Sequence, residues 1–160
     1  RALGLSMLMT AGLIVAFLFA YYGKERQYYF TPEEVAASEY LYKVAPPNSL
    51  IIEGSLNYPT FYRNYEYFTH VAIDREPRES QLSIAADPVR VMTRWMDNRD
   101  YAAVYLIFTR SQIASVDDVG DLQFSGTMRE ISKAVIASPS FTVIFQNSDA
   151  TILELNTLDK

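Results

Sequence analysis

The chain has 160 residues, a formal net charge of −5 and no cysteine. This acidic balance disfavours nucleic acid as a partner, because binding phosphates needs a surplus of Lys and Arg. Without cysteine there is no disulfide framework and no thiol for catalysis or metal binding. The length fits one domain that is large enough to bury its own core.

Residues 2–22 (ALGLSMLMTAGLIVAFLFAYY) carry no charged side chain. At about 1.5 Å per residue, a helix of this length matches the ~30 Å hydrocarbon layer of a bilayer. Tyr21 and Tyr22, followed by Lys24, are typical of the membrane interface. A cleaved signal peptide fits poorly, since the run is long and no small-residue cleavage site follows. The sequence therefore predicts a transmembrane helix over 1–22, a juxtamembrane linker over 23–30 and a soluble domain over 31–160.

Within this apolar segment Gly12, Ala16 and Ala20 recur every four residues and so share one helix face. Small residues on one face let a second transmembrane helix approach closely. The lipid bilayer and other transmembrane helices are therefore the partners expected of this segment. Because the chain begins with Arg, we expect it to be cut from a longer protein with earlier membrane spans.

The soluble part begins with a strong helix signal. Thr31 is suited to the N-cap, Pro32 to the first helical position, and Glu34 to the third position of a capping box. The proline pair at 46–47 ends this helix, and a short buried strand follows over 49–53. Residues 56–68 are rich in aromatics and predict a loop or irregular helix that leads into a strand at about 67–73.

A polar turn is expected over 74–80, and a second helix is expected to start at Asp87-Pro88 and to end near Asn98. An apolar strand follows over 101–108, and then a 16-residue connection over 109–124. A third helix over 125–138 precedes two strands, 141–146 and 150–155, which form a hairpin. Strands alternating with helices predict a small α/β sandwich with a mixed sheet and a C-terminal β-hairpin, preceded by one transmembrane helix.

Three segments resemble the C-terminal extracytoplasmic domain of polytopic, lipid-phosphate-sugar-dependent membrane glycosyltransferases of the C-type fold. They are the span ending in AYYGKERQYYF, the block FTPEEVAASEYLYKVAPPNSLII and the ending SPSFTVIFQNSDATILEL. The resemblance implies an extracytoplasmic position, although a count of flanking positive charges would place the domain in the cytoplasm. In that family the catalytic acidic residues lie in loops between early membrane helices, so this chain is expected to carry none.

Candidate binding residues fall in two segments. The aromatic cluster of residues 58–68 offers rings that stack on sugars, although such rings also serve a core or a membrane interface. The end of the strand at 108 is where open α/β sheets bind ligands, and polar side chains follow it there. The substrate-binding residues predicted from these two segments are Tyr58, Tyr62, Tyr65, Tyr67, Arg110 and Gln112.

Metal and cofactor chemistry is not expected. Asp117, Asp118 and Asp121 lack the spacing of a calcium loop and are expected in a solvated turn. His70 is the only histidine and has no second ligand at metal-binding spacing, so a structural or exposed role is expected. Ser111 lacks the glycine-flanked turn of a nucleophile.

These features predict a non-catalytic, membrane-integral domain of a glycosyltransferase-like protein that assists the binding of an acceptor or a lipid-linked sugar. Two alternatives remain open. One is a single-pass, membrane-anchored binding or interaction module unrelated to sugars, and the other is a cytoplasmic domain of a transporter or sensor.

Overall fold

The structure is a computed structural model that describes residues 2–22, 29–56, 65–119 and 127–156. Its centre is a five-stranded sheet in the order β2-β1-β3-β5-β4. β1, β2 and β3 run parallel, whereas β5 is antiparallel to both β3 and β4. The α/β fold with a mixed sheet and a C-terminal hairpin is therefore confirmed. The strands are β1 (Ser49–Glu53), β2 (Phe68–Ala72), β3 (Val104–Thr109), β4 (Phe141–Gln146) and β5 (Ala150–Leu155).

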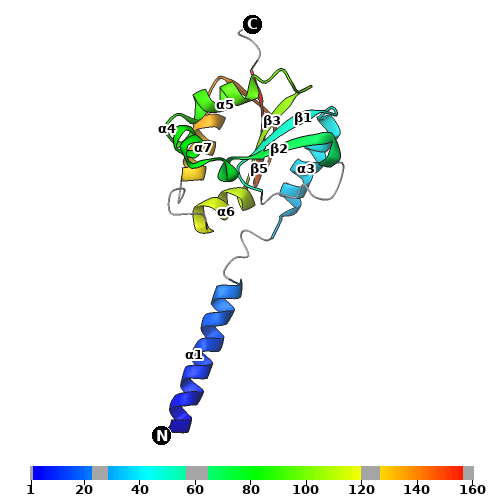
Figure 1. The fold of residues 1–160 in the computed structure, drawn as a ribbon. Helices are drawn as coiled ribbons and strands as arrows, with labels where there is room; N and C mark the ends of the chain where they lie inside the picture. The colour runs from blue at the N-terminus through cyan, green and yellow to red at the C-terminus, as the bar shows by residue number, and fades with distance from the viewer. Residues whose placement is uncertain (1, 23–28, 57–64, 120–126, 157–160) are drawn as a thin grey trace.

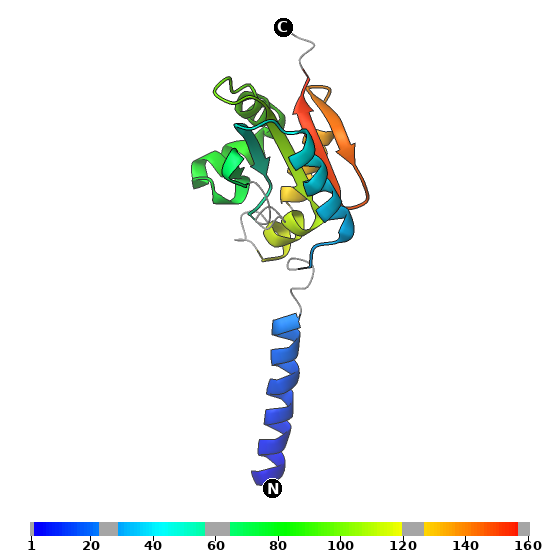
Figure 2. The same cartoon turned by 90° about the vertical axis from the view of Figure 1, so that its right-hand side faces the viewer.

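Helices cover both faces of this sheet (Figures 1 and 2). α3 (Pro32–Val44) lies on one face. The helices of the other face are α4 (Arg78–Ala86), α5 (Pro88–Met96), α6 (Arg110–Val119) and α7 (Thr127–Ile136). Residues on β1 alternate between the two layers. Leu50 and Ile52 belong to the core beneath α4, α5 and α7, and Ile51 belongs to the core beneath α3.

The expected helix starts at Thr31 and Asp87 are confirmed. The Thr31 hydroxyl accepts from the Glu34 backbone N–H at 3.2 Å, and the Glu34 carboxylate accepts from the Thr31 N–H at 2.9 Å. This is a complete capping box. At the start of α5 the Asp87 carboxylate accepts from the Arg90 N–H at 3.2 Å.

The expectation of a turn over 74–80 was wrong in part, because α4 begins at Arg78 after a short 3₁₀ turn, η2 (Ile73–Arg75). Only Ile84 of α4 is fully buried, and Leu82 is 56% exposed. Apolar residues that recur every three or four positions identify a surface helix, and this segment has almost no such pattern. The 16-residue connection expected over 109–124 contains a helix, since α6 starts directly at Arg110.

α1 (Ala2–Tyr22) is a helix of 21 residues that extends away from the α/β domain in both ribbon views (Figures 1 and 2). The structure describes its side chains at positions 4 and 6–21. Large apolar side chains there are exposed, among them Leu8 at 73% and Phe19 at 76%. In the part of the chain that the structure describes, no helix is found that is long and apolar enough to cross a membrane.

Candidate functional site at the carboxyl edge of the sheet

The carboxyl ends of β1, β2 and β3 meet at one edge of the sheet, formed by residues 53–55, 72–74 and 109–112. We call this the carboxyl edge. β1 has β2 on one side and β3 on the other, so the strand order reverses at β1. Open α/β sheets bind ligands at such a reversal. In Figure 1 this edge, marked by the start of α6, faces the side of the domain from which α1 extends.

A carboxylate–histidine pair lies at this edge between β1 and β2. Glu53 Oε1 is 2.6 Å from His70 Nδ1, and the Glu53 side chain is only 1% exposed. The register pairs Glu53 with Ala72, so His70 is a diagonal neighbour on the same face of the sheet. Burial raises the pKa of the Glu53 carboxyl above its ordinary value, although the hydrogen bond to His70 and the charge of His70 oppose this shift.

A second carboxyl group extends the cluster. The Ser55 hydroxyl is hydrogen-bonded to Asp74, and burial raises the pKa of the Asp74 carboxyl despite that bond and nearby Arg75. The negative charge of Asp74 also contributes to the raised pKa of Glu53. Within the described residues, His70 Nε2 is buried and has no hydrogen-bond partner. The carboxylate of Glu53 thus orients the imidazole of His70 through Nδ1.

The shifted pKa of Glu53 predicts a pH dependence of stability. When folding raises the pKa of a carboxyl group, the resulting stabilisation is complete at pH values below the ordinary pKa, which is 4.5 for Glu53. This contribution is lost as the pH rises through the folded-state pKa. We therefore expect Glu53→Gln, which cannot ionise, to gain free energy of unfolding relative to the wild type as the pH rises from 4.5. Urea unfolding of both proteins at several pH values measures the difference.

Because His70 is the only histidine, its imidazole NMR signals report the same pair without overlap. They should change on Glu53→Gln and stay unchanged on Glu39→Gln, a substitution on α3. A difference in stability between wild type and Glu53→Gln that is constant with pH would contradict the prediction.

On the other side of β1, the carboxyl edge holds the segment that leads from α1 into the domain. The guanidinium of Arg110 donates from Nη2 to the carbonyl oxygen of Tyr29 at 2.7 Å and lies 3.5 Å from Glu34. The fully buried Glu34 carboxylate also accepts from the Ser111 backbone N–H at 2.6 Å. These bonds join the start of α3 to the start of α6, across 76 to 81 residues of sequence. Tyr29, the first described residue after α1, is therefore held against the carboxyl edge. We call this arrangement of Tyr29, Glu34, Arg110 and Ser111 the linker clamp.

Thr109 and Gln112 form a capping box for α6. The Thr109 hydroxyl accepts from the Gln112 N–H at 3.3 Å, and Gln112 Oε1 accepts from the Thr109 N–H at 3.0 Å. Gln112 is fully buried, and a Cβ at Gly54 would lie 3.6 Å from its Cβ. The T-x-x-Q spacing is itself the sequence signal of such a cap. It would have revealed both the helix and the structural use of Gln112.

The structure does not bring the predicted binding residues into one described site. Tyr58 and Tyr62 lie outside the described residues, and the side chain of Tyr65 is likewise not described. Tyr67 is 52% exposed in a 3₁₀ turn, η1 (Tyr65–Tyr67). Arg110 and Gln112 contact protein groups in the linker clamp and in the α6 cap. Their binding of a substrate therefore stays a prediction.

The acidic segment was expected in a solvated turn, but Asp117 and Asp118 lie in the last turn of α6, where Asp117 has a capping role. Asp117 Oδ1 accepts from the Met128 N–H at 3.0 Å at the start of α7, and Asp117 Oδ2 lies 4.0 Å from Arg129. Burial raises the pKa of Asp117. Asp118 is exposed at the end of α6, and Asp121 lies outside the described residues. Among the residues that are described, no group of three or more His, Cys, Asp or Glu side chains could hold a metal ion.

A cavity of about 470 Å³ opens beside Arg110 at this edge, between the end of β3, α7 and the turn before β5. Arg129 and Asn147 also line it. The fold therefore defines the chain's class as an α/β domain with a mixed sheet and a polar carboxyl edge. The chain matches no protein-family model, no curated protein and no solved structure.

Proposed function

We propose that this chain is a non-catalytic, membrane-anchored domain of a glycosyltransferase-like membrane protein. α1 serves as the anchor, and the α/β domain lies at the extracytoplasmic surface with its carboxyl edge toward the bilayer. There it assists the binding of an acceptor or a lipid-linked sugar. The link to glycosyltransferases rests on the sequence resemblance described above, and the close docking rests on the linker clamp.

The linker clamp is the observation that carries the proposal. A flexible tether would leave the domain free to turn, whereas the bond from Arg110 to the Tyr29 carbonyl fixes the chain seven residues after the end of α1. The seven residue steps from Tyr22 to Tyr29 span at most about 25 Å. The carboxyl edge must therefore stay near whatever surface holds the C-terminal end of α1.

The exposure of α1 supports the anchor. Burial of a large apolar side chain is worth about 1.5–3 kcal/mol relative to exposure to water. α1 presents a series of such side chains around its surface, and the Thr10 hydroxyl donates to the Ser6 carbonyl at 3.0 Å, which satisfies that polar group inside the helix. A lipid environment would remove this apolar surface from water.

Extraction of the full chain from lipid vesicles tests the anchor. We expect the wild type to stay with the vesicles at alkaline pH, while the double variant Leu13→Arg and Phe17→Arg is released. Each Arg placed near the middle of α1 in lipid would cost about 2.5–3.5 kcal/mol. Leu82→Arg, a matched change on exposed α4, should behave as the wild type. Release of the wild type would overturn the proposal.

The docking is tested separately by lengthening the linker. Ten flexible residues inserted after Lys24 should impair sugar transfer by the parent protein, because they free the carboxyl edge from the membrane surface. The same insertion should leave the unfolding free energy of the domain unchanged. Full transfer activity of the insertion variant would refute a positioning role.

A further inference from the structure

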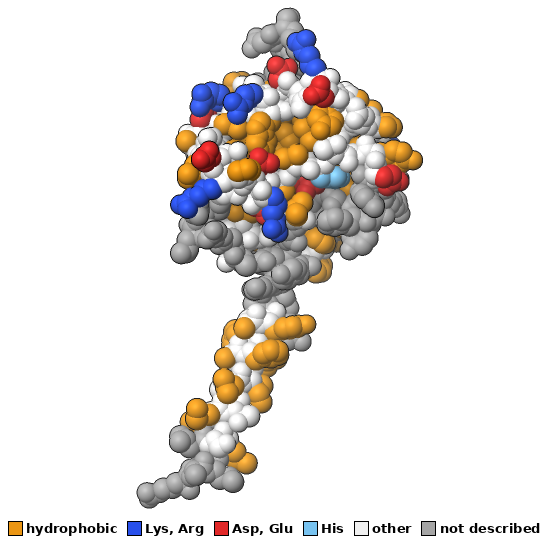
Figure 3. Space-filling model, viewed as in Figure 1, with side chains coloured by type: hydrophobic (Ala, Val, Ile, Leu, Met, Phe, Trp, Pro, Cys, Tyr) orange, Lys and Arg blue, Asp and Glu red, His pale blue; other side chains and the backbone are white. Residues whose placement is uncertain are grey.

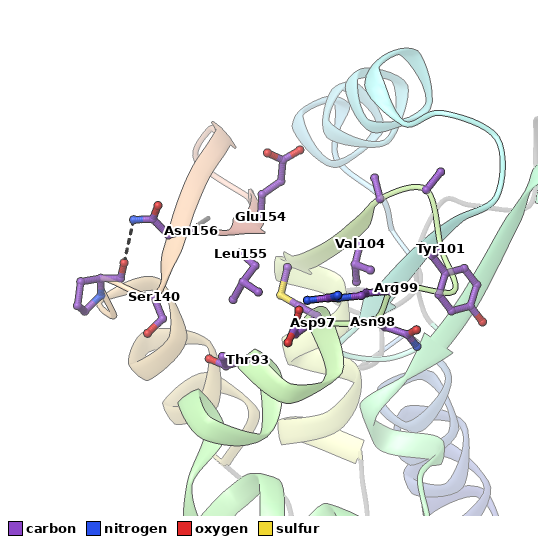
Figure 4. Close-up of a pocket in the computed structure, with 14 residues that line it drawn as sticks. Thr93, Asp97, Asn98, Arg99, Tyr101, Val104, Ser140, Glu154, Leu155 and Asn156 are labelled. Atoms are coloured by element: carbon purple, nitrogen blue, oxygen red, sulfur yellow. Dashed lines mark hydrogen bonds between the residues drawn. The ribbon is translucent and has the colours of Figure 1, made fainter. Parts of the chain in front are cut away.

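A cavity lies at the opposite end of the sheet from the linker clamp. It has a volume of about 770 Å³ and opens between the end of α5, the start of β3 and the end of β5 (Figure 4). A second cavity of about 620 Å³ adjoins it over β1 and β2. The two cavities share Asp97, Asn98, Arg99 and Tyr101 as lining residues. Residues 97–101, which we call the dividing segment, therefore form a wall common to both.

Backbone hydrogen bonds hold the dividing segment in place. The Asp97 N–H donates to the Thr93 carbonyl at 2.9 Å, and the Asn98 side-chain oxygen accepts from the Asp100 N–H at 3.0 Å. Asn48, which adopts a left-handed backbone with φ of 65°, donates from its side chain to the Asp100 carbonyl at 3.2 Å. A site whose backbone is fixed before binding loses less conformational entropy when a ligand arrives.

In the part of the chain that the structure describes, the charged side chains of this segment have no ionic partners. No described carboxylate lies within 4.0 Å of the guanidinium of Arg99 or of Arg94. Asp97 and Asp100 likewise take part in no ion pair among the described residues. Figure 4 shows Arg99 and Asp97 extending into the larger cavity, with Glu154 on the β5 side. Charged donors and acceptors therefore line the same cavity without forming an ion pair there.

Apolar and aromatic surface completes the lining. Trp95 and Tyr101 are half-buried and line the smaller cavity together with Leu50, Ile52 and Val71. Figure 3 shows apolar side chains gathered in a hollow on the face that carries α5, β1 and β2, with charged side chains around it. Serine and threonine hydroxyls and the amide of Asn156 line the larger cavity, and that amide donates to the Pro139 carbonyl at 3.2 Å.

These properties select a class of ligand. The two cavities contain Arg94 and Arg99 against Glu76, Asp97, Asp100 and Glu154, so their summed charge is negative and disfavours phosphates and carboxylates. A neutral sugar has hydroxyls that both donate and accept, and a face of C–H groups that packs on aromatic rings. The two cavities offer hydrogen-bonding side chains for the hydroxyls and aromatic rings for the C–H face. Each cavity also falls in the size range of small-molecule sites.

We propose that a neutral oligosaccharide binds across the dividing segment, with Arg99 and Asp97 hydrogen-bonding its hydroxyls and the rings of Trp95 and Tyr101 contacting its apolar faces. This inference goes beyond the proposed function, because the site lies at the other end of the sheet, and it rests on that function only for the biological source of the saccharide. The binding itself is a property of this chain. It also places the saccharide on the membrane-distal side of the domain, away from the linker clamp.

The experiment uses the full chain in detergent on an array of neutral and acidic oligosaccharides, followed by calorimetric titration of the neutral glycan with the strongest signal. Arg99→Ala and Asp97→Ala should each weaken binding at least about tenfold, because hydrogen bonds to charged groups are the strong ones. Arg90→Ala is the matched control, since Arg90 lies on α5, is 79% exposed and lines neither cavity.

Three outcomes would overturn the inference: no glycan bound by the wild type, equal binding by Arg99→Ala and Arg90→Ala, or binding of spermidine or acidic glycans in place of neutral ones. Spermidine is the cationic probe, because the excess of carboxylates would attract it without any use of the arginines. Release of the chain from vesicles would overturn the anchor and leave glycan binding intact. Absence of glycan binding would leave the anchor intact.

Discussion

Replacing Glu34 by alanine is expected to lower the free energy of unfolding of the α/β domain by about 3–5 kcal/mol. The carboxylate is fully buried and accepts from the backbone N–H groups of Thr31 and Ser111 at 2.9 and 2.6 Å. Alanine leaves both donors without a partner and removes the counter-charge of Arg110. Arg110 is 32% exposed, so water compensates part of its loss.

Urea unfolding followed by circular dichroism measures this effect. Glu33→Ala is the control, because the neighbouring Glu33 carboxylate is exposed and its removal should change the free energy of unfolding by no more than about 0.5 kcal/mol. Glu34→Gln keeps one acceptor oxygen and should fall between the two. A loss below about 1 kcal/mol for Glu34→Ala would mean that the linker clamp does not hold α3 and α6 together.

Ile52→Ala is expected to cost about 2–5 kcal/mol, the usual range for truncating a buried isoleucine. Ile52 is fully buried in the middle of β1, between Val71 on β2 and Leu106 on β3. The cavity left there would loosen the strand that ends in Glu53 and Gly54. We therefore expect the imidazole signals of His70 to broaden as well.

The control for Ile52 is Leu82→Ala on α4, where the side chain is 56% exposed. This change should leave the free energy of unfolding within about 0.5 kcal/mol of the wild type. Thermal and urea unfolding of both variants measure the contrast. Equal losses for Ile52→Ala and Leu82→Ala would contradict the assignment of Ile52 to the central core.

The sequence by itself determined the features that depend on neighbouring residues. The capping boxes need only residues three apart, so Thr31 and Glu34 could be recognised directly, and the cap at Thr109 and Gln112 was readable in the same way. The two strands expected over 141–146 and 150–155, joined by a polar turn, coincide with the observed bounds of β4 and β5. The α/β class followed from the order of these local elements.

Tertiary structure alone decided which polar groups meet. His70 was expected to be structural or exposed, and its pairing with Glu53 depends on the register of β1 against β2, which the sequence does not encode locally. Arg110 was expected to bind a substrate, yet it contacts Tyr29, 81 residues earlier. The dividing segment acquires its cavities only when β5 and α5 come together around it. Such contacts depend on the burial of distant apolar surfaces against one another, and short-range sequence patterns do not contain that information.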